Sequence, residues 1–229
     1  NATEMGYFDL LSLTQPAAWV TDGSGRTTSA NSQILVDYLR GDTSNETTGG
    51  TAPSDLYRNR AHLLGDIVDA QPAYVRASPF GYNSGSYAGT DPNYPAFQAN
   101  TASRAGIVFA ASNDGMLHAF NTQGPNGELY YQTAGIATQA TSDDTFTGTL
   151  VTSATVGQGS ERWAFVPSMV LPHLENLANS PYSHQYYTDG SPQIGDVCFG
   201  HTLSTPCAAA GNWHTILVAG LNSGGRGYY

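Results

Sequence analysis

Short apolar runs separated by turns rich in glycine and asparagine dominate the chain beyond residue 60. The run from Ile107 to Phe120 is interrupted by Asn113-Asp114-Gly115, and an Asp-Gly step between two apolar runs predicts a β-hairpin. Other strand-rich units begin near residues 67, 162 and 214. Units of about 40–50 residues with several short strands each are typical of propeller blades. The pattern predicts an all-β fold, a partial β-propeller of about three to four blades.

Helical spacing of apolar residues is confined to two segments, Ile34–Leu39 and Pro167–Leu177. The polar stretch 41–54 and the Gly, Pro and Asn-rich stretch 77–101 predict long loops. We therefore expect residues 1–60 to form an N-terminal extension or linker with a short helix. Residues 61–229 are expected to form the N-terminal part of a propeller domain.

The negative net charge of the chain restricts the classes of partner that it is expected to bind. The chain has 18 acidic and 8 basic residues, all of the latter arginine, and a net charge of −10. Affinity for phosphate backbones comes mainly from Lys and Arg, so a nucleic-acid partner is not expected. No apolar stretch reaches the length of a membrane span, and the polar start Asn1–Glu4 does not resemble a signal peptide. The strand-like end Gly227–Tyr229 predicts that the chain is a piece of something longer.

Cys198 and Cys207 are the two cysteines of the chain, and a short loop separates them. Two thiols between strand-like segments predict a disulfide and therefore an oxidising compartment. A zinc site that also uses His201 is the alternative, although a second pair of ligands at zinc spacing is missing.

Two acidic motifs are candidates for chemistry. Asp189 and Asp196 lie in one Gly- and Pro-containing loop and are weak candidates for calcium ligands, since Ca²⁺ takes several oxygen ligands. Turns stabilised by Asx hydrogen bonds are the alternative. Asp114 and His118 suggest a catalytic pair, but no nucleophile is adjacent in sequence, and a hairpin with alternating side chains is the favoured interpretation.

The triplet Arg40-Gly41-Asp42 follows the first helical segment. Integrins recognise this triplet on exposed turns, which makes it a candidate binding site for host cells. The alternative is a turn in which Asp42 accepts backbone N–H groups, and a three-residue motif occurs often by chance.

An ordered set of segments resembles the start of the C-terminal propeller of the PilY family, the tip-associated adhesins and assembly factors of type IV pili. The segments are Val36–Asp42, Tyr57–Arg60, Leu64–Val68, Gln71-Pro72, Tyr74-Val75, Ala111–Phe120, Trp163–Pro167, Tyr182–His184, Tyr187–Gly190, Asp196, Trp213–Leu221 and Gly224–Tyr228. Together they cover about residues 33–229.

The resemblance implies a non-enzymatic protein that caps the pilus through minor pilins and attaches to a host or abiotic surface. It implies an extracellular location reached through the periplasm, and partner blades that complete the propeller. It also implies a calcium loop, which in the family lies beyond the segment that ends here at Tyr229. No cofactor is therefore assigned to the chain itself.

Two other functions remain open at the level of sequence. Gly127-Glu128 after the Met116–Phe120 run faintly resembles quinoprotein repeats, but Leu129-Tyr130-Tyr131 follows where that class has tryptophan. A glycan-binding or glycan-cleaving propeller is the other, and cleavage needs two carboxyl groups about 5–10 Å apart.

Overall fold

The computed structural model describes residues 6–8, 13–21, 23, 25–47, 55–78, 80, 82, 91–122, 129–133, 136–140, 159–199 and 207–229. The helical elements in chain order are η1 Gly6–Phe8, α2 Gln15–Thr21, α3 Arg26–Ser29, α4 Ser32–Leu39, α5 Tyr94–Thr101, η3 Leu171–Ala178, η4 Ala210–Asn212 and η5 Asn222–Gly224. The strands are β1 Ala73–Val75, β2 Ile107–Ser112, β3 Met116–Asn121, β4 Leu129–Thr133, β5 Ile136–Ala140, β6 Glu161–Phe165, β7 Gln193–Cys198 and β8 Trp213–Val218. Among these residues no helix has the length and apolar character needed to cross a bilayer.

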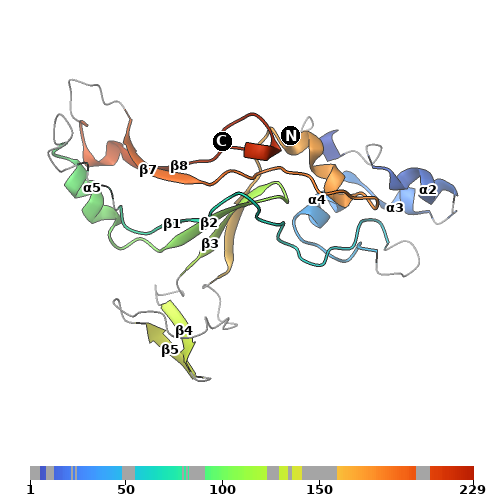
Figure 1. Cartoon of the computed structure of the whole chain (residues 1–229), viewed down its shortest axis with the longest axis horizontal. Coiled ribbons are helices and arrows are strands. Elements are labelled where there is room, and N and C mark those ends of the chain that lie inside the picture. The colour runs from blue at the N-terminus through green and yellow to red at the C-terminus, as the bar shows by residue number, and fades with distance from the viewer. Residues whose placement is uncertain are drawn as a thin grey trace.

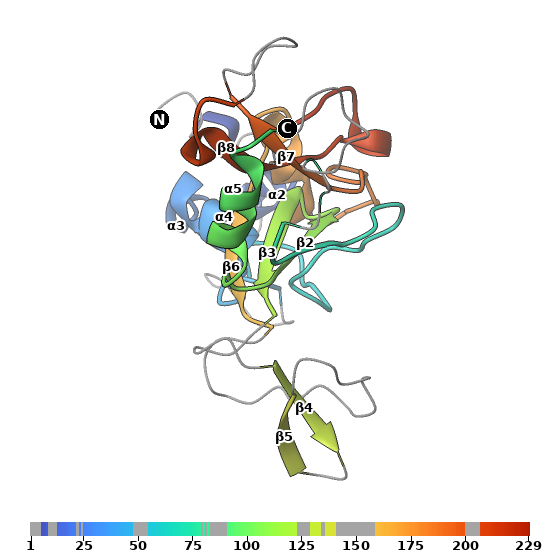
Figure 2. The same cartoon turned by 90° about the vertical axis from the view of Figure 1, so that its left-hand side faces the viewer.

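The described strands form three antiparallel sheets. The largest has the order β1-β2-β3-β6, while β4 pairs with β5 and β7 pairs with β8. Figure 1 shows the β4–β5 hairpin projecting away from the rest of the chain, and Figure 2 shows the same from the side. Four antiparallel strands with a second sheet against one face correspond to one propeller blade followed by the inner strands of the next.

This topology agrees with the partial propeller but corrects the assignment of one strand. The strand that begins near residue 162 was expected to open a new unit. Instead β6 pairs with β3, with Leu117 opposite Phe165 and a register shift at Ala119/Phe120. It therefore completes the first blade, and the described sheets contain one four-stranded blade and part of a second.

The predicted hairpin is present as β2 and β3, with Ser112 opposite Met116. Its turn ends at Gly115, whose φ of +85° lies in the left-handed region that glycine adopts at little cost. A side chain at that position would also collide with the side chain of Leu174.

The helical predictions are right in part. α4 is present, and the Asn31 side chain accepts the Ile34 N–H at its start, a typical N-cap. The helix predicted from Pro167 begins four residues later as the 3₁₀ element η3, after a turn in which the Val170 N–H donates to the Pro167 carbonyl. The loop predicted for 77–101 is wrong over α5, where a proline near the helix start is compatible with the first turn.

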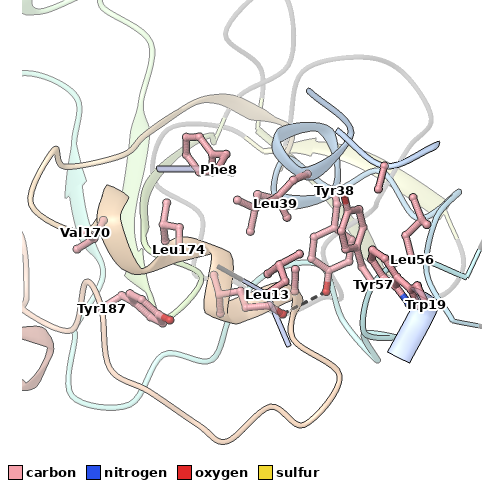
Figure 3. Packing of buried hydrophobic residues seen from close by; sticks show 14 of the residues in the cluster. Phe8, Leu13, Trp19, Tyr38, Leu39, Leu56, Tyr57, Val170, Leu174 and Tyr187 are labelled. Carbon is pink, nitrogen blue, oxygen red and sulfur yellow. Dashed lines mark hydrogen bonds between the residues drawn. The ribbon is translucent and has the colours of Figure 1, made fainter. Parts of the chain in front are cut away.

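The main hydrophobic core lies between the N-terminal helices and η3, as Figure 3 shows. Its buried members are Phe8, Leu13, Trp19, Ala30, Leu35, Tyr38, Leu39, Leu56, Tyr57, Val170, Leu174, Leu177, Ala178, Tyr187 and Leu221. Residues on both sides of position 60 therefore share one core. Phe8, Leu13 and Trp19 of this core come from the N-terminal stretch in which the sequence pattern predicted no element.

A second core joins the two blades. Phe109 and Leu117 of the first sheet are buried in it, and Ile194 and Leu217 of β7 and β8 pack against it. One face of the β1-β2-β3-β6 sheet is therefore covered by the start of the next blade, as neighbouring blades of a propeller pack.

Candidate functional site

A cavity lies over β3 and β6, on the face opposite the second blade. Its volume is about 700 Å³. It is lined by Leu39, Arg40, Gly41, Leu63, Leu64, Asp114, Met116, His118, Phe120, Glu161, Arg162, Trp163, Ala164 and Val166. The cavity thus brings the first two residues of the Arg-Gly-Asp triplet together with the Asp114–His118 pair, although some 70 residues separate them in sequence.

His118 occupies the centre of this cavity between two carboxylates. Its Nε2 lies 3.0 Å from Asp114 Oδ2, and its Nδ1 lies 2.5 Å from Glu161 Oε1. The Asp114 carboxylate also accepts hydrogen bonds from the Ser112 hydroxyl and the Gly65 N–H. The imidazole of His118 therefore connects Asp114 in the hairpin turn with the edge strand β6. Through its bond to the Gly65 N–H, Asp114 also holds the segment that precedes β1.

These contacts shift both pKa values. Burial by itself lowers the pKa of His118, but the two carboxylates outweigh it and raise the pKa above its usual value. Burial by itself raises the pKa of Asp114, but hydrogen bonds from His118, Ser112 and Gly65 outweigh it and lower the pKa. The charged forms of both groups are favoured, so the arrangement is an ion pair with a half-exposed second carboxylate.

The geometry does not match the nucleophilic pair considered from sequence. Both ring nitrogens of His118 face carboxylates, and the nearby Ser112 hydroxyl donates to Asp114 rather than to the imidazole. A serine nucleophile needs a histidine nitrogen that accepts its proton. Asp114 and Glu161 are likewise engaged by the same imidazole, so they are not an independent acid and base for glycoside cleavage.

The triplet Arg40-Gly41-Asp42 forms the C-terminal cap of α4. The three backbone N–H groups donate in turn to carbonyls of Val36, Tyr38 and Asp37. Gly41 has a φ of +108°, and the Asp42 carboxylate accepts the N–H of a serine two residues later. The turn considered as the alternative is therefore present, while the side chains of Arg40 and Asp42 are exposed.

A buried ion pair holds this cap in place. Arg60 Nε donates to Glu46 Oε1 at 2.6 Å, and both side chains are less than one-tenth exposed. The same guanidinium donates to the carbonyls of Tyr38 and Asp42 and lies 3.7 Å from the centre of the Tyr38 ring. The guanidinium of Arg60, a planar group with several donors, therefore holds the backbone of this cap in place.

The two cysteines form the predicted disulfide. Cys198 at the end of β7 is bonded to Cys207. His201, the third residue of the zinc alternative, lies outside the described residues, as does the Gly127-Glu128 pair of the quinoprotein alternative. The disulfide itself leaves neither thiolate free to bind zinc.

Asp189 and Asp196, the weak calcium candidates, are each held by other donors of the protein. Asp189 is buried and accepts hydrogen bonds from the Asp69 N–H and the Asn222 amide. Asp196 is also buried, but it accepts from the hydroxyls of Tyr94 and Thr215. Across the described ranges, no group of three or more His, Cys, Asp or Glu side chains is arranged to hold a metal. Both aspartates are thus satisfied by separate protein donors.

Comparison with known proteins identifies the family. The profile of the PilY1 beta-propeller domain matches residues 64–229. The chain belongs to this family. It is 31% identical over 200 residues to the type IV pilus biogenesis factor PilY1 of Pseudomonas aeruginosa strain PAK, covering 86% of the chain and 13% of that protein.

Other members of the family give the same result. A PilY1 homolog of Xylella fastidiosa strain Temecula1 is 32% identical over 231 residues, covering 100% of the chain and 14% of that protein. The PilY1 of P. aeruginosa strain UCBPP-PA14 is 26% identical, covering 94% and 14%. No solved structure matches the chain significantly. The chain thus spans about one-eighth to one-seventh of the length of these relatives.

Sequence reasoning placed Asp114, His118 and the triplet but missed Glu161, Arg60 and Glu46. The bulge between β3 and β6 puts Glu161 opposite Phe120, and a pattern of strands does not reveal this register. The isolated bridge between Glu46 and Tyr57 brings Glu46 near Arg60 across a polar stretch that reads as a loop.

Proposed function

We propose that this chain is part of a type IV pilus biogenesis factor that caps the pilus through minor pilins and attaches the cell to a surface. The observation that carries the proposal is the family match over residues 64–229, together with relatives that are named as pilus biogenesis factors. The proposed role is non-enzymatic. The doubly engaged imidazole of His118 supports it, because this group is built as a structural tie.

The proposed attachment site is the triplet Arg40-Gly41-Asp42. Its backbone is held as a helix cap and supported by the buried Arg60–Glu46 pair, while its charged side chains face solvent. Because the backbone of the triplet is already fixed, little backbone conformational entropy is lost on binding, which favours recognition of such a short motif.

The proposed location is the cell surface, reached through the periplasm. The Cys198–Cys207 disulfide supports it, since disulfides persist in oxidising compartments. Calcium dependence, which the family resemblance implies, stays a proposal about polypeptide outside this chain, because Asp189 and Asp196 are occupied by protein donors.

The test is a strain that lacks the gene, complemented with the wild-type protein or with Asp42→Glu. Surface pili are counted by electron microscopy, and attachment to cultured cells and to glass is measured in parallel. We expect no surface pili without the gene. The Asp42→Glu variant should restore pili but not attachment to cells, with Asp37→Glu on the same helix as control. Normal numbers of pili in the strain that lacks the gene would contradict the proposed role in pilus assembly. Full attachment of the Asp42→Glu strain would contradict only the proposal that the triplet is the attachment site.

A further inference from the structure

A second cavity lies where the N-terminal helical part of the chain meets the hairpin turn of the first blade. Its volume is about 230 Å³, and it is lined by residues of α4, η3, the β2–β3 turn and the stretches 58–66 and 182–184. Neither His118 nor the Arg-Gly-Asp triplet lines it, so it is distinct from the cavity over β3 and β6. We call it the junction cavity.

The charged side chains around the junction cavity leave one positive charge without a counter-charge. Both carboxylates and one of the two guanidinium groups in its wall are paired: Asp66 with His184 at 2.7 Å, Asp114 with His118 at 3.0 Å, and Arg60 with Glu46 at 2.6 Å. The other guanidinium belongs to Arg58. Among the described residues, no carboxylate lies within ion-pair distance of it.

Arg58 is nevertheless held in a defined position. Its Nε donates to the Leu177 carbonyl at 3.0 Å, and its guanidinium carbon lies 4.1 Å from the centre of the Tyr182 ring. Neither contact neutralises the charge. The residue is half-buried, and a charge in such surroundings interacts more strongly with a counter-charge than it does in water. In a chain with a net charge of −10, an unpaired and positioned guanidinium favours an anionic ligand.

An independent observation concerns Asn113 in the hairpin turn. Asn113 lines the junction cavity and is 2% exposed. Its Oδ1 accepts the Tyr187 N–H at 3.0 Å, but its buried Nδ2 has no hydrogen-bond partner among the described residues. A buried donor without an acceptor is costly, and an acceptor atom of a bound molecule removes that cost. The cavity therefore lacks both a negative charge and a hydrogen-bond acceptor.

The size and the remaining lining of the cavity select the class of ligand. One unpaired guanidinium balances one negative charge, whereas a phosphate dianion would also face the carboxylates of Asp66 and Asp114 in the same wall. Leu63, Leu64 and Leu177 supply apolar wall. A water takes about 30 Å³ of liquid, so the cavity has room for about eight groups of that size. A carboxylate on a short, branched hydrocarbon chain meets all of these conditions.

We propose that the junction cavity binds a small monocarboxylate with an apolar body. The guanidinium of Arg58 pairs with the carboxylate, the Asn113 amide donates to an acceptor of the same molecule, and the leucines contact its hydrocarbon part. Such a carboxylate is supplied either by a free short-chain acid or by the C-terminal residue of a polypeptide. The inference is independent of the proposed attachment role of the triplet, whose residues do not line this cavity.

The test uses two ligands that differ only at the carboxylate. Isocaproate and its neutral amide, isocaproamide, are titrated into the full-length gene product that contains these residues. Binding is followed by saturation-transfer difference NMR of the ligand methyl groups. We expect isocaproate to bind, and isocaproamide to bind at least about tenfold more weakly. N-Acetyl-leucine has the same carbon skeleton on a chain-end carboxylate. Tighter binding of N-acetyl-leucine than of isocaproate assigns the site to a polypeptide C-terminus, and equal or weaker binding assigns it to a free acid.

Two variants locate the bound carboxylate. Arg58→Gln removes the unpaired charge and should weaken binding by about tenfold to 150-fold, as expected for the loss of one hydrogen-bonded charge. Ala61→Phe enlarges an exposed side chain in the cavity wall and should weaken binding at least as much. Because Ala61 is exposed, this variant keeps the test decisive if thermal unfolding shows that Arg58→Gln is not folded. Arg76→Gln, at an exposed arginine that does not line the cavity, is the control and should bind as wild type does.

Three results overturn the proposal. One is equal affinity for isocaproate and isocaproamide, since the charge then has no role. Another is the absence of binding by both isocaproate and N-acetyl-leucine at millimolar concentration. The third is unchanged affinity in both Arg58→Gln and Ala61→Phe, which would place the bound carboxylate elsewhere on the protein.

Discussion

Replacement of His118 by glutamine tests the electrostatic tie between the hairpin turn and β6. Two contacts are lost, and they differ in strength. The side chain of Glu161 is 45% exposed, so its bond to His118 is screened by water and contributes about 0–1 kcal/mol. The side chain of Asp114 is 14% exposed, and a charge-assisted bond in such surroundings contributes about 1.5–3 kcal/mol. We therefore expect His118→Gln to cost about 1.5–4 kcal/mol of unfolding free energy while the imidazole is charged.

The pH dependence of this difference is the sharper part of the prediction. The folded-state pKa of His118 is raised above its unfolded value, so the stabilisation is complete below about pH 6.5. It is lost as pH rises through the raised folded pKa. The difference between wild type and His118→Gln should therefore be largest near pH 5.5 and shrink toward pH 9.

Urea denaturation followed by tryptophan fluorescence at a series of pH values measures the difference. His62→Gln is the control, because the side chain of His62 is exposed. A cost for His118→Gln that stays constant between pH 5.5 and 9 would refute the reasoning, since a purely steric role does not depend on protonation.

Three further changes probe other parts of the fold. Glu46→Ala leaves a buried guanidinium without its partner and should cost about 3–5 kcal/mol in urea denaturation, whereas a cost below 1 kcal/mol contradicts the buried ion pair. Gly115→Ala forces a side chain into a left-handed turn and against Leu174, and its thermal unfolding midpoint should fall by several degrees. Replacing both Cys198 and Cys207 by serine should cost about 2–3 kcal/mol, and the double variant should match reduced wild type in stability.

The sequence predicted the parts of the fold that local patterns determine. The β2–β3 hairpin follows from an Asp-Gly turn between apolar runs, and α4 from the helical spacing of apolar residues in Ile34–Leu39. It did not predict that β6 joins the same blade as β3. That pairing connects strands on either side of an insertion, so no local pattern contains it.

The candidate site was predictable only in pieces. Asp114, His118 and Arg40 are conspicuous in the sequence, but the contact between His118 and Glu161 depends on a register shift in the β3–β6 pair. The helical segment α2 was missed because its single buried tryptophan, Trp19, lies among small and polar residues. Its burial comes from tertiary packing against the rest of the core rather than from local periodicity.

The insertion between β3 and β6 has a consequence for how this family can vary. Residues 122–160 separate β3 from β6 in the sequence, and the β4–β5 hairpin in this stretch is a separate two-stranded sheet. The entropy of closing a flexible loop grows only with the logarithm of its length, by about 0.6 kcal/mol for each doubling. The length of the stretch between β3 and β6 can therefore change at little thermodynamic cost to the blade.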